Sequence, residues 1–394
     1  MERTPNSNRL HVVIFGRTNS GKSSLINAIT GQDTALTSPI AGTTTDTVAR
    51  AMELHGIGAS LIIDTPGFDD HGELGQGRIS RAVRSLDRAD VALLLCEEGD
   101  LALEKEWCNE LKSRNIPTIA VINKIDIRED VTSFAESIVS RLGLTPILLS
   151  AKEGIDIEQV REAILRVLPA DATEQTILGD MVVDGDIVLL VMPQDPQAPK
   201  GRLILPQVQT MRELLDRRAV VISCTTDQLR QSLEALSAPP KLIITDSQVF
   251  SEVYAQKPEQ SALTSFSVLM AGYKGDIRAF VEGAAAIDSL TPNSRVLIAE
   301  ACTHAPLSED IGREKLPRIL RSRVGVELNI DIVAGRDFPA DLSPYDLVIH
   351  CGGCMFNRKY MLSRLARAKE QGVPMTNYGV AIAHLNSILD KIVY

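Results

Sequence analysis

The sequence predicts an α/β protein in which a phosphate-binding domain is followed by two smaller α/β domains. Short apolar runs alternate with helical patterns along the 394 residues, which is typical of parallel sheets covered by helices. A glycine-rich phosphate loop follows the first apolar run, and cysteines and histidines gather after two late apolar runs. Apolar periodicity is lost at residues 168–175, where we expect a linker. We therefore place the domains at residues 1–170, 178–262 and 263–394.

Composition argues against several classes of protein. The formal net charge of −10 disfavours a nucleic-acid partner, because binding to a phosphate backbone needs clustered Lys and Arg. No apolar run reaches the roughly 18 residues of a membrane helix, and the first residues lack the apolar core of a signal peptide. We therefore expect a cytoplasmic protein with no membrane partner. The six cysteines do not form a disulfide framework in such a chain, and we expect Cys96 and Cys224 in the hydrophobic core.

The phosphate loop has the sequence G-x-x-x-x-G-K-S between a predicted strand at residues 10–15 and a predicted helix from Ser24, the context that this motif requires. Backbone N–H groups of such a loop surround the β-phosphate, and the N-terminus of the helix favours its negative charge. We expect Lys22 to reach the β- and γ-phosphates and the Ser23 hydroxyl to bind Mg²⁺. The residues expected at the phosphates are Gly16, Asn19, Ser20, Gly21, Lys22, Ser23 and Ser24.

Three further motifs follow predicted strands. Asp64 begins D-T-P-G and is expected in the Mg²⁺ shell, while Gly67 ends it and is expected to donate its N–H to the γ-phosphate. In Asn123-Lys124-Ile-Asp126, the Asp126 carboxylate can accept from two adjacent donors, which guanine has and adenine lacks. In Ser150-Ala151-Lys152, the Ala151 N–H can meet the guanine O6. These motifs together predict a site for GTP rather than ATP.

The first domain resembles P-loop GTPases of the translation-factor class, in particular the group of the tRNA-modification GTPase MnmE and Era. The resemblance includes residues 41–46, A-G-T-T-T-D, which are similar to that group's switch I motif with Thr45 in place of an arginine. It implies that Thr44, or its neighbour Thr43, completes the Mg²⁺ shell when GTP is bound.

The same resemblance bears on catalysis. Phe68 stands where Ras-type enzymes place the glutamine that positions water. The MnmE group uses K⁺ instead, held partly by an asparagine of the phosphate loop, and Asn19 matches that position; the alternative for Asn19 is a solvent-facing loop residue. The resemblance thus implies a K⁺-stimulated GTPase. Its catalytic residues would be Lys22, Asn19, Thr44 and Asp64.

The middle domain shows apolar runs at residues 186–192, 202–205, 219–223 and 241–245, and helical patterns at 209–218 and 228–236. We find no pair of His, Asp or Glu residues in it that suggests catalysis. A domain of apolar strands without a site is often an oligomerisation module. We therefore expect a homodimer through residues of about 180–260; a mere spacer is the alternative.

The third domain is predicted from strands at residues 263–268, 295–300, 327–333 and 346–350. Helical patterns occur at 276–289, 313–323 and 358–371, and residues 379–393 are expected to form a final amphipathic helix.

Two cysteine segments leave strands of this third domain. One is His350-Cys351-Gly-Gly-Cys354, and the other is Cys302-Thr-His304. Ligands of an open parallel sheet gather outside the carboxyl ends of its strands, so we expect the three thiols and two imidazoles to meet there. Cys₃His is a regular zinc ligand set, whereas three thiolates on a four-iron cluster would leave one iron open. The residues alone leave zinc and iron–sulfur open.

The whole chain resembles the maturation GTPases of [FeFe]-hydrogenase. The resemblance implies a [4Fe–4S] cluster on Cys302, Cys351 and Cys354, with His304, His350 or Glu300 as a labile ligand of the open iron or a neighbour of the cluster. It also implies a scaffold that accepts a transient diiron precursor from radical maturase enzymes and passes it to apo-[FeFe]-hydrogenase. The alternative is a zinc-stabilised regulatory GTPase that acts as a molecular switch on RNA or the ribosome.

Overall fold

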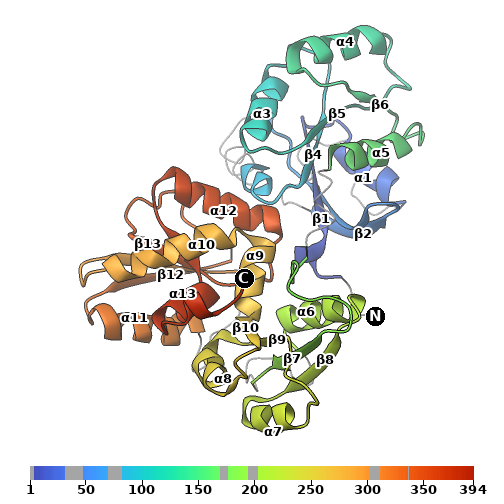
Figure 1. Ribbon diagram of the computed structural model, residues 1–394. Coiled ribbons are helices and arrows are strands. Elements are labelled where there is room, and N and C mark those ends of the chain that lie inside the picture. Colours follow the sequence, from blue (N-terminus) through green and yellow to red (C-terminus); the bar gives the residue numbers. More distant parts are fainter. Residues whose placement is uncertain are drawn as a thin grey trace. The chain divides into compact units, whose positions relative to one another are not determined.

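The computed structural model describes residues 4–31, 48–69, 82–168, 176–193, 203–301, 311–335 and 337–394. The chain divides into two compact units, Met1–Thr173 and Glu174–Tyr394 (Figure 1). This division falls in the stretch where the apolar periodicity is lost. None of the helices in the described ranges has the length and apolar content needed to cross a membrane.

Unit 1 contains a six-stranded sheet of order β2-β3-β1-β4-β5-β6. The strands are β1 (Leu10–Gly16), β2 (Val48–Leu54), β3 (Gly58–Asp64), β4 (Val91–Leu95), β5 (Thr118–Ile122) and β6 (Ile147–Leu148). All neighbouring strands are parallel except β2, which is antiparallel to β3. The carboxyl ends of β1, β3, β4, β5 and β6 therefore lie at one edge of the sheet.

Helices cover both faces of this sheet. They are α1 (Lys22–Thr30), α3 (Ala102–Ser113), α4 (Val131–Leu142) and α5 (Glu158–Val167). Because successive side chains of a strand point to opposite faces, Val13 and Phe15 of β1 join a core with α3 and α4. Val12 and Ile14 join a second core with α1 and α5. Burial on both faces explains why β1 is a continuous apolar run.

Unit 2 begins with a four-stranded parallel sheet of order β10-β9-β7-β8. Its strands are β7 (Ile187–Val191), β8 (Val220–Cys224), β9 (Leu242–Thr245) and β10 (Ala262–Ser265). The helices are α6 (Leu205–Asp216), α7 (Leu229–Glu234) and α8 (Phe250–Gln256). The outer edge of β10 is partly covered, because the Val393 N–H donates to the Leu263 carbonyl oxygen over 2.9 Å.

Two predicted strands are wrong in this region. A strand was predicted at 202–205, but residues 203 and 204 form no strand and Leu205 is the first residue of α6. Pro206 favours this helix start, because the first turn of a helix does not use its missing N–H. The run at 263–268 is a strand only to Ser265, whose hydroxyl accepts from the Val268 N–H over 3.2 Å and caps α9 (Phe266–Lys274). That strand, β10, pairs with β9 in the first sheet of unit 2.

The second sheet of unit 2 is also parallel, with order β12-β11-β13-β14. Its strands are β11 (Arg295–Glu300), β12 (Asn329–Ala334), β13 (Leu347–His350) and β14 (Met375–Asn377). Its helices are α10 (Ile277–Ala284), α11 (Leu316–Val324), α12 (Arg358–Glu370) and α13 (Tyr378–Leu385). The sequence predicted β11, β12 and β13 but not the short β14.

The final helix is shorter and more buried than predicted. An amphipathic helix was expected at 379–393, but α13 ends at Leu385. Val380 packs into the core that the two sheets of unit 2 share. Ala381 and Ile382 pack into a separate core that includes Val296 of β11 and Leu347 of β13. A helix buried on both sides is apolar all round.

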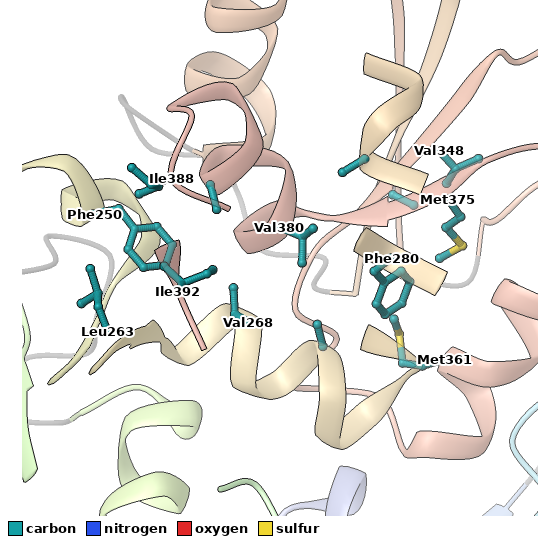
Figure 2. Close-up of a cluster of buried hydrophobic side chains, with 14 of the residues drawn as sticks. Phe250, Leu263, Val268, Phe280, Val348, Met361, Met375, Val380, Ile388 and Ile392 are labelled. Atoms are coloured by element: carbon teal, nitrogen blue, oxygen red, sulfur yellow. The ribbon is translucent and has the colours of Figure 1, made fainter. Parts of the chain in front are cut away.

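One hydrophobic core joins the two sheets of unit 2. Figure 2 shows Phe250 and Leu263, from the first sheet's side, in the same core as Val348 and Met375 of the second sheet. Val380 of α13 lies between them. The partition of this unit into a middle and a third domain stays a prediction.

Candidate functional site

The phosphate loop connects β1 to α1 at the carboxyl edge of the first sheet. Asn19 and Gly21 have positive φ angles of 62° and 89°, and a side chain on Gly21 would collide with the Asn123 amide. Ser20 is buried, whereas Asn19 is exposed. The loop therefore turns sharply just before α1, and such a turn at a helix N-terminus is typical of phosphate-binding loops.

Lys22 and Ser23 begin α1 and face the loop. The Lys22 ammonium donates to the carbonyl oxygens of Gly16 and Arg17 over 3.0 and 2.7 Å. Burial lowers the pKa of Lys22. A phosphate next to this amine would favour the charged form, because opposite charges raise the pKa of a lysine.

Ser23 and Asp64, the two residues expected to bind Mg²⁺, contact each other. The Ser23 hydroxyl donates to Asp64 Oδ2 over 2.9 Å. The other carboxylate oxygen, Asp64 Oδ1, is buried and has no hydrogen-bond partner among the described residues, and burial raises the pKa of this carboxyl. An unpaired buried oxygen beside a serine hydroxyl fits the oxygen ligands that Mg²⁺ prefers. Thr43 and Thr44, expected to complete the shell, lie outside the described residues.

The predicted guanine site lies around a cavity of about 780 Å³. Its lining includes Gly21, Ser24, Asn123, Lys124, Asp126, Ala151 and Lys152. Asp126 is held by the Ser150 hydroxyl, which donates to Oδ1 over 2.6 Å and lowers the pKa of the carboxyl. The carboxylate is therefore ionised and oriented, as an acceptor for two N–H groups must be.

Asn123 links this cavity to the phosphate loop. Its amide donates to the Ser20 carbonyl oxygen over 3.3 Å, and its Oδ1 accepts from the Lys124 N–H over 2.8 Å. The Ala151 N–H, expected at the guanine O6, donates to the same Oδ1 over 3.0 Å. The Lys124 ammonium reaches the Asn19 carbonyl oxygen over 2.5 Å. Asn123 and Lys124 thus hold the phosphate loop in place, and Ala151 holds Asn123.

Gly67 and Phe68 stand at the end of the D-T-P-G motif and directly after it. A Cβ on Gly67 would overlap the Thr18 hydroxyl and lie 2.8 Å from the Thr18 nitrogen, so only glycine fits against the phosphate loop. Phe68 is buried and stacks on Trp107, with ring centroids 5.6 Å apart. Its side chain belongs to the core, so it does not position water in the site.

Sequence reasoning missed two contacts of the loop. Asp69 Oδ1 accepts from both the N–H and the hydroxyl of Thr18, over 2.7 and 2.8 Å. Arg17 forms a two-pronged ion pair with the fully buried Glu104, over 2.6 and 2.9 Å. Both pairs join segments far apart in the sequence, and no local motif marks them.

The cysteine segment after β13 lies at the carboxyl edge of the second sheet of unit 2. β11 and β13 are parallel neighbours that pair Ala299 with His350. Beyond them, the Ala301 N–H donates to Cys351 Sγ over 3.0 Å. Cys302 is the next residue but, like His304, lies outside the described residues. Ala301, the residue before Cys302, therefore contacts the Cys351 thiol, and the meeting of the three thiols stays a prediction.

Cys351 and Cys354 are partly exposed thiols. Gly353, between them, has a φ of 63°, and a side chain there would lie 2.6 Å from the Met361 sulfur. Within the described ranges, no three His, Cys, Asp or Glu side chains are grouped as metal ligands. Two accessible thiols, one with an N–H···S bond, fit a thiolate-held metal group, since hydrogen bonds to cysteine sulfur are regular features of such sites.

His350 has both ring nitrogens engaged. Nδ1 lies 2.8 Å from the Cys351 carbonyl oxygen, and Nε2 lies 2.7 Å from Nη1 of Arg364. A carbonyl only accepts, so Nδ1 carries the proton and Nε2 accepts from the guanidinium. Complete burial, together with the neighbouring Arg364, lowers the pKa of His350 to about 3. The neutral ring supports the cysteine segment, and its nitrogens are not free for a metal.

Glu300, the remaining candidate ligand, is buried at the end of β11. Its Oε2 accepts from Nη2 and Nε of Arg313 over 3.1 and 3.2 Å. The Tyr378 hydroxyl lies 3.5 Å from its Oε1. A metal-ligand role for Glu300 would therefore compete with this ion pair.

The mostly parallel sheet, the phosphate loop, the buried Asp64 and the motifs predicted to read guanine define unit 1 as a P-loop GTPase domain. A family of 50S ribosome-binding GTPases matches residues 11–124. The Hydrogen maturase F dimerization domain matches residues 177–275, and the Hydrogen maturase F tetramerization domain matches residues 278–394. These two domains together make up more than half of the chain, which therefore belongs to the hydrogen maturase F family.

The chain is also similar to the tRNA modification GTPase MnmE. It is 35% identical over 170 residues to that of Paraburkholderia xenovorans (strain LB400), covering 43% of this chain and 36% of the relative. For that of Burkholderia thailandensis the identity is 37% over 172 residues, covering 43% and 37%. The chain thus spans little more than a third of the length of these relatives. A crystal structure of Aquifex aeolicus Era bound to GDP and aluminium fluoride has a TM-score of 0.38 at 23% identity, covering 55% of this chain and 92% of Era.

Proposed function

We propose that this GTPase is a scaffold for hydrogenase maturation that holds a [4Fe–4S] cluster on Cys302, Cys351 and Cys354. It accepts a diiron precursor from radical maturase enzymes and transfers it to apo-[FeFe]-hydrogenase. The single observation that carries the proposal is the Ala301 N–H donating to Cys351 Sγ, because it brings the residue before Cys302 to the Cys351 thiol in a chain with hydrogen maturase F domains. Cysteine ligation needs reduced thiols, which favours a cytoplasmic protein.

Hydrolysis of GTP rests on residues of unit 1. Lys22 and the loop N–H groups would stabilise the phosphate charges, and Mg²⁺ held by Ser23, Asp64 and Thr44 or Thr43 would neutralise the β- and γ-oxygens. Phe68 is buried in the core, so no side chain at this position can orient the attacking water. We propose that K⁺, bound partly by Asn19, supplies the missing positive charge, as an arginine finger does in other GTPases.

The K⁺ proposal is tested by hydrolysis rates in KCl and NaCl at equal ionic strength. We expect the rate to be about a hundredfold higher in K⁺. Asn19→Ala should lower the rate in K⁺ towards that in Na⁺ while GTP binding persists. Equal wild-type rates in the two salts would refute the K⁺ site.

The cluster is tested by iron, sulfide and zinc analysis of protein reconstituted anaerobically. We expect iron and sulfide, and we expect Cys302→Ala, Cys351→Ala and Cys354→Ala each to lose them and to lose hydrogenase activation, with unchanged GTP hydrolysis. Cys224→Ala is a matched control, because Cys224 is a buried core thiol of the same unit. A colourless protein that retains zinc would instead support the regulatory zinc GTPase.

Coupling of the two sites is a separate proposal. The phosphate loop and the cysteine segment lie in different compact units, so each site should assemble without the other. Lys22→Ala should keep its iron content and the EPR signal of the reduced cluster, but it should activate apo-hydrogenase more slowly. Activation by Lys22→Ala at the wild-type rate would show that GTP turnover is not required.

We propose that the dimerization domain pairs through β8. This strand ends the sheet, and Val220 on it is 50% exposed. An unpaired strand edge is a template for another strand, and a two-fold axis would place two copies of β8 antiparallel. Val220→Lys should shift the protein towards monomer in light scattering. Val183→Lys changes an exposed valine outside β8 and should leave the dimer intact. If light scattering gives Val220→Lys the same molar mass as wild type, this interface is refuted.

A further inference from the structure

Arg364 is a buried cation with no acidic partner in the described part of the chain. It lies on α12, the helix that follows the Cys354 turn, and is only 2% exposed. Its hydrogen bonds go to three neutral groups: the His350 ring, the Gly335 carbonyl oxygen and the Tyr360 hydroxyl, over 2.7, 2.6 and 3.3 Å. A buried charge without an opposite charge is costly. An anionic group near it would offset that cost.

Aromatic rings surround the guanidinium. Its carbon lies 4.6 Å from the ring centroids of Phe338 and Phe356 and 4.7 Å from that of Tyr360. Three ring faces stabilise a cation and hold a planar guanidinium in one orientation. Phe356 also packs against Tyr360, with centroids 4.5 Å apart. This enclosure fixes the direction of the donors of Arg364.

Those donors connect the strand ends that carry the cysteine segments. Gly335 follows β12, and its N–H donates to the Glu300 carbonyl oxygen at the end of β11 over 2.9 Å. His350 ends β13 and holds the Cys351 carbonyl oxygen through Nδ1. Arg364 therefore contacts the ends of β12 and β13 directly. It is linked to the end of β11 through Gly335. The two cysteine segments begin at β11 and β13.

Arg364 is linked to Cys351 through the His350 ring, which accepts from the guanidinium at Nε2 and donates to the Cys351 carbonyl oxygen from Nδ1. Burial lowers the pKa of Arg364, and the neighbouring tyrosine and Cys351 act in the opposite direction. Thiolates of an iron–sulfur site carry negative charge, and the cluster gains another negative charge when it is reduced. A nearby buried cation would thus favour both thiolate ligation and reduction.

We propose that Arg364 is a positioning and charge-balancing residue of the cysteine site, which fixes the His350 ring and the Cys351 segment and stabilises the negative charge of the bound cluster. This rests on the proposed cluster. Arg364 touches no reacting atom; it acts through His350 and through its charge.

The test compares three variants of the full chain, reconstituted anaerobically with iron and sulfide. Arg364→Met removes the charge and the donors, and Arg364→Lys keeps the charge but loses the planar fork. Arg367→Met is the control, because Arg367 is one turn further along α12 and donates to the Pro339 carbonyl oxygen, not to His350. Two quantities are measured: the rate at which a chelator removes iron and the midpoint potential of the cluster by EPR-monitored titration.

We expect the chelator to remove iron about tenfold faster, or more, from Arg364→Met, with a more negative midpoint potential. Arg364→Lys should also lose iron faster but should keep a potential closer to wild type, since its charge remains. Arg367→Met should stay within about twofold of wild type.

The outcomes separate the two proposals. Wild-type protein that holds no iron after reconstitution overturns the proposed function itself. Wild-type protein with a stable cluster, and Arg364→Met with the same chelation rate and potential, overturns only the role of Arg364. If Arg364→Met does not fold, Arg364→Lys decides: wild-type resistance to the chelator would refute the positioning role. Faster iron loss from a folded Arg364→Met at wild-type potential would refute the charge role.

Discussion

Replacing Gly283 with alanine should destabilise unit 2, although alanine favours helices. Gly283 lies in α10, directly against the backbone of β14. A Cβ there would overlap the Met375 carbonyl oxygen and lie 2.7 Å from its carbon. These atoms belong to a backbone held in the sheet beside β13, so they cannot move away as a flexible side chain would.

The magnitude follows from two opposing effects. Alanine is about 1 kcal/mol better than glycine inside a helix. Overpacking a well-filled interior costs about 1–3 kcal/mol, and collision with backbone atoms places Gly283→Ala at the upper end. The net loss is therefore about 2 kcal/mol, which lowers the melting temperature of a unit of this size by about 4–8 °C.

Gly272→Ala is the matched control. Gly272 lies in the neighbouring helix α9, and a Cβ there would meet its nearest atom at 3.9 Å, an ordinary contact. Its melting temperature should rise by about 2–4 °C. Calorimetry measures both variants. The single tryptophan, Trp107, lies in unit 1, so its fluorescence should follow a transition that neither variant shifts.

The reasoning would be refuted if Gly283→Ala raised the calorimetric transition of unit 2 as Gly272→Ala does. That result would mean that α10 can move away from β14 at little cost. If the Trp107 fluorescence transition of Gly283→Ala also moved to a lower temperature, the two units would unfold together.

Three further predictions concern unit 1. Arg17→Ala should lower the stability of this unit by about 3–5 kcal/mol, measured by denaturant unfolding, because it leaves the buried Glu104 without its partner; unchanged stability would contradict the ion pair's role. Asp126→Asn should weaken the preference for GTP over ATP in competition binding, because one acceptor of the base-reading carboxylate is lost; an unchanged preference would place guanine recognition elsewhere. Cys96 should resist thiol reagents at pH 8 in the folded protein, because burial raises the pKa of its thiol to about 12; labelling as fast as that of Cys354 would contradict its burial.

The sequence by itself determined the nucleotide site. Each of its motifs is a short contiguous segment after an apolar strand, and parallel strands bring their carboxyl ends to one edge. Lys22, Ser23, Asp64, Asn123 and Asp126 could therefore be predicted to gather at that edge without coordinates. The same rule placed the Cys351 segment beside the end of β11.

Only the tertiary structure decided features that depend on contacts between distant segments. The direction of Phe68 into the core and the pairing of Asp69 with Thr18 depend on neighbours remote in sequence. So does the membership of β10, since an apolar run does not specify which sheet completes its hydrogen bonds. Arg364 looked like an ordinary charged residue of a helix. Its burial follows from the three aromatic rings and the strand ends around it, which the fold brings together from three separate stretches of the chain.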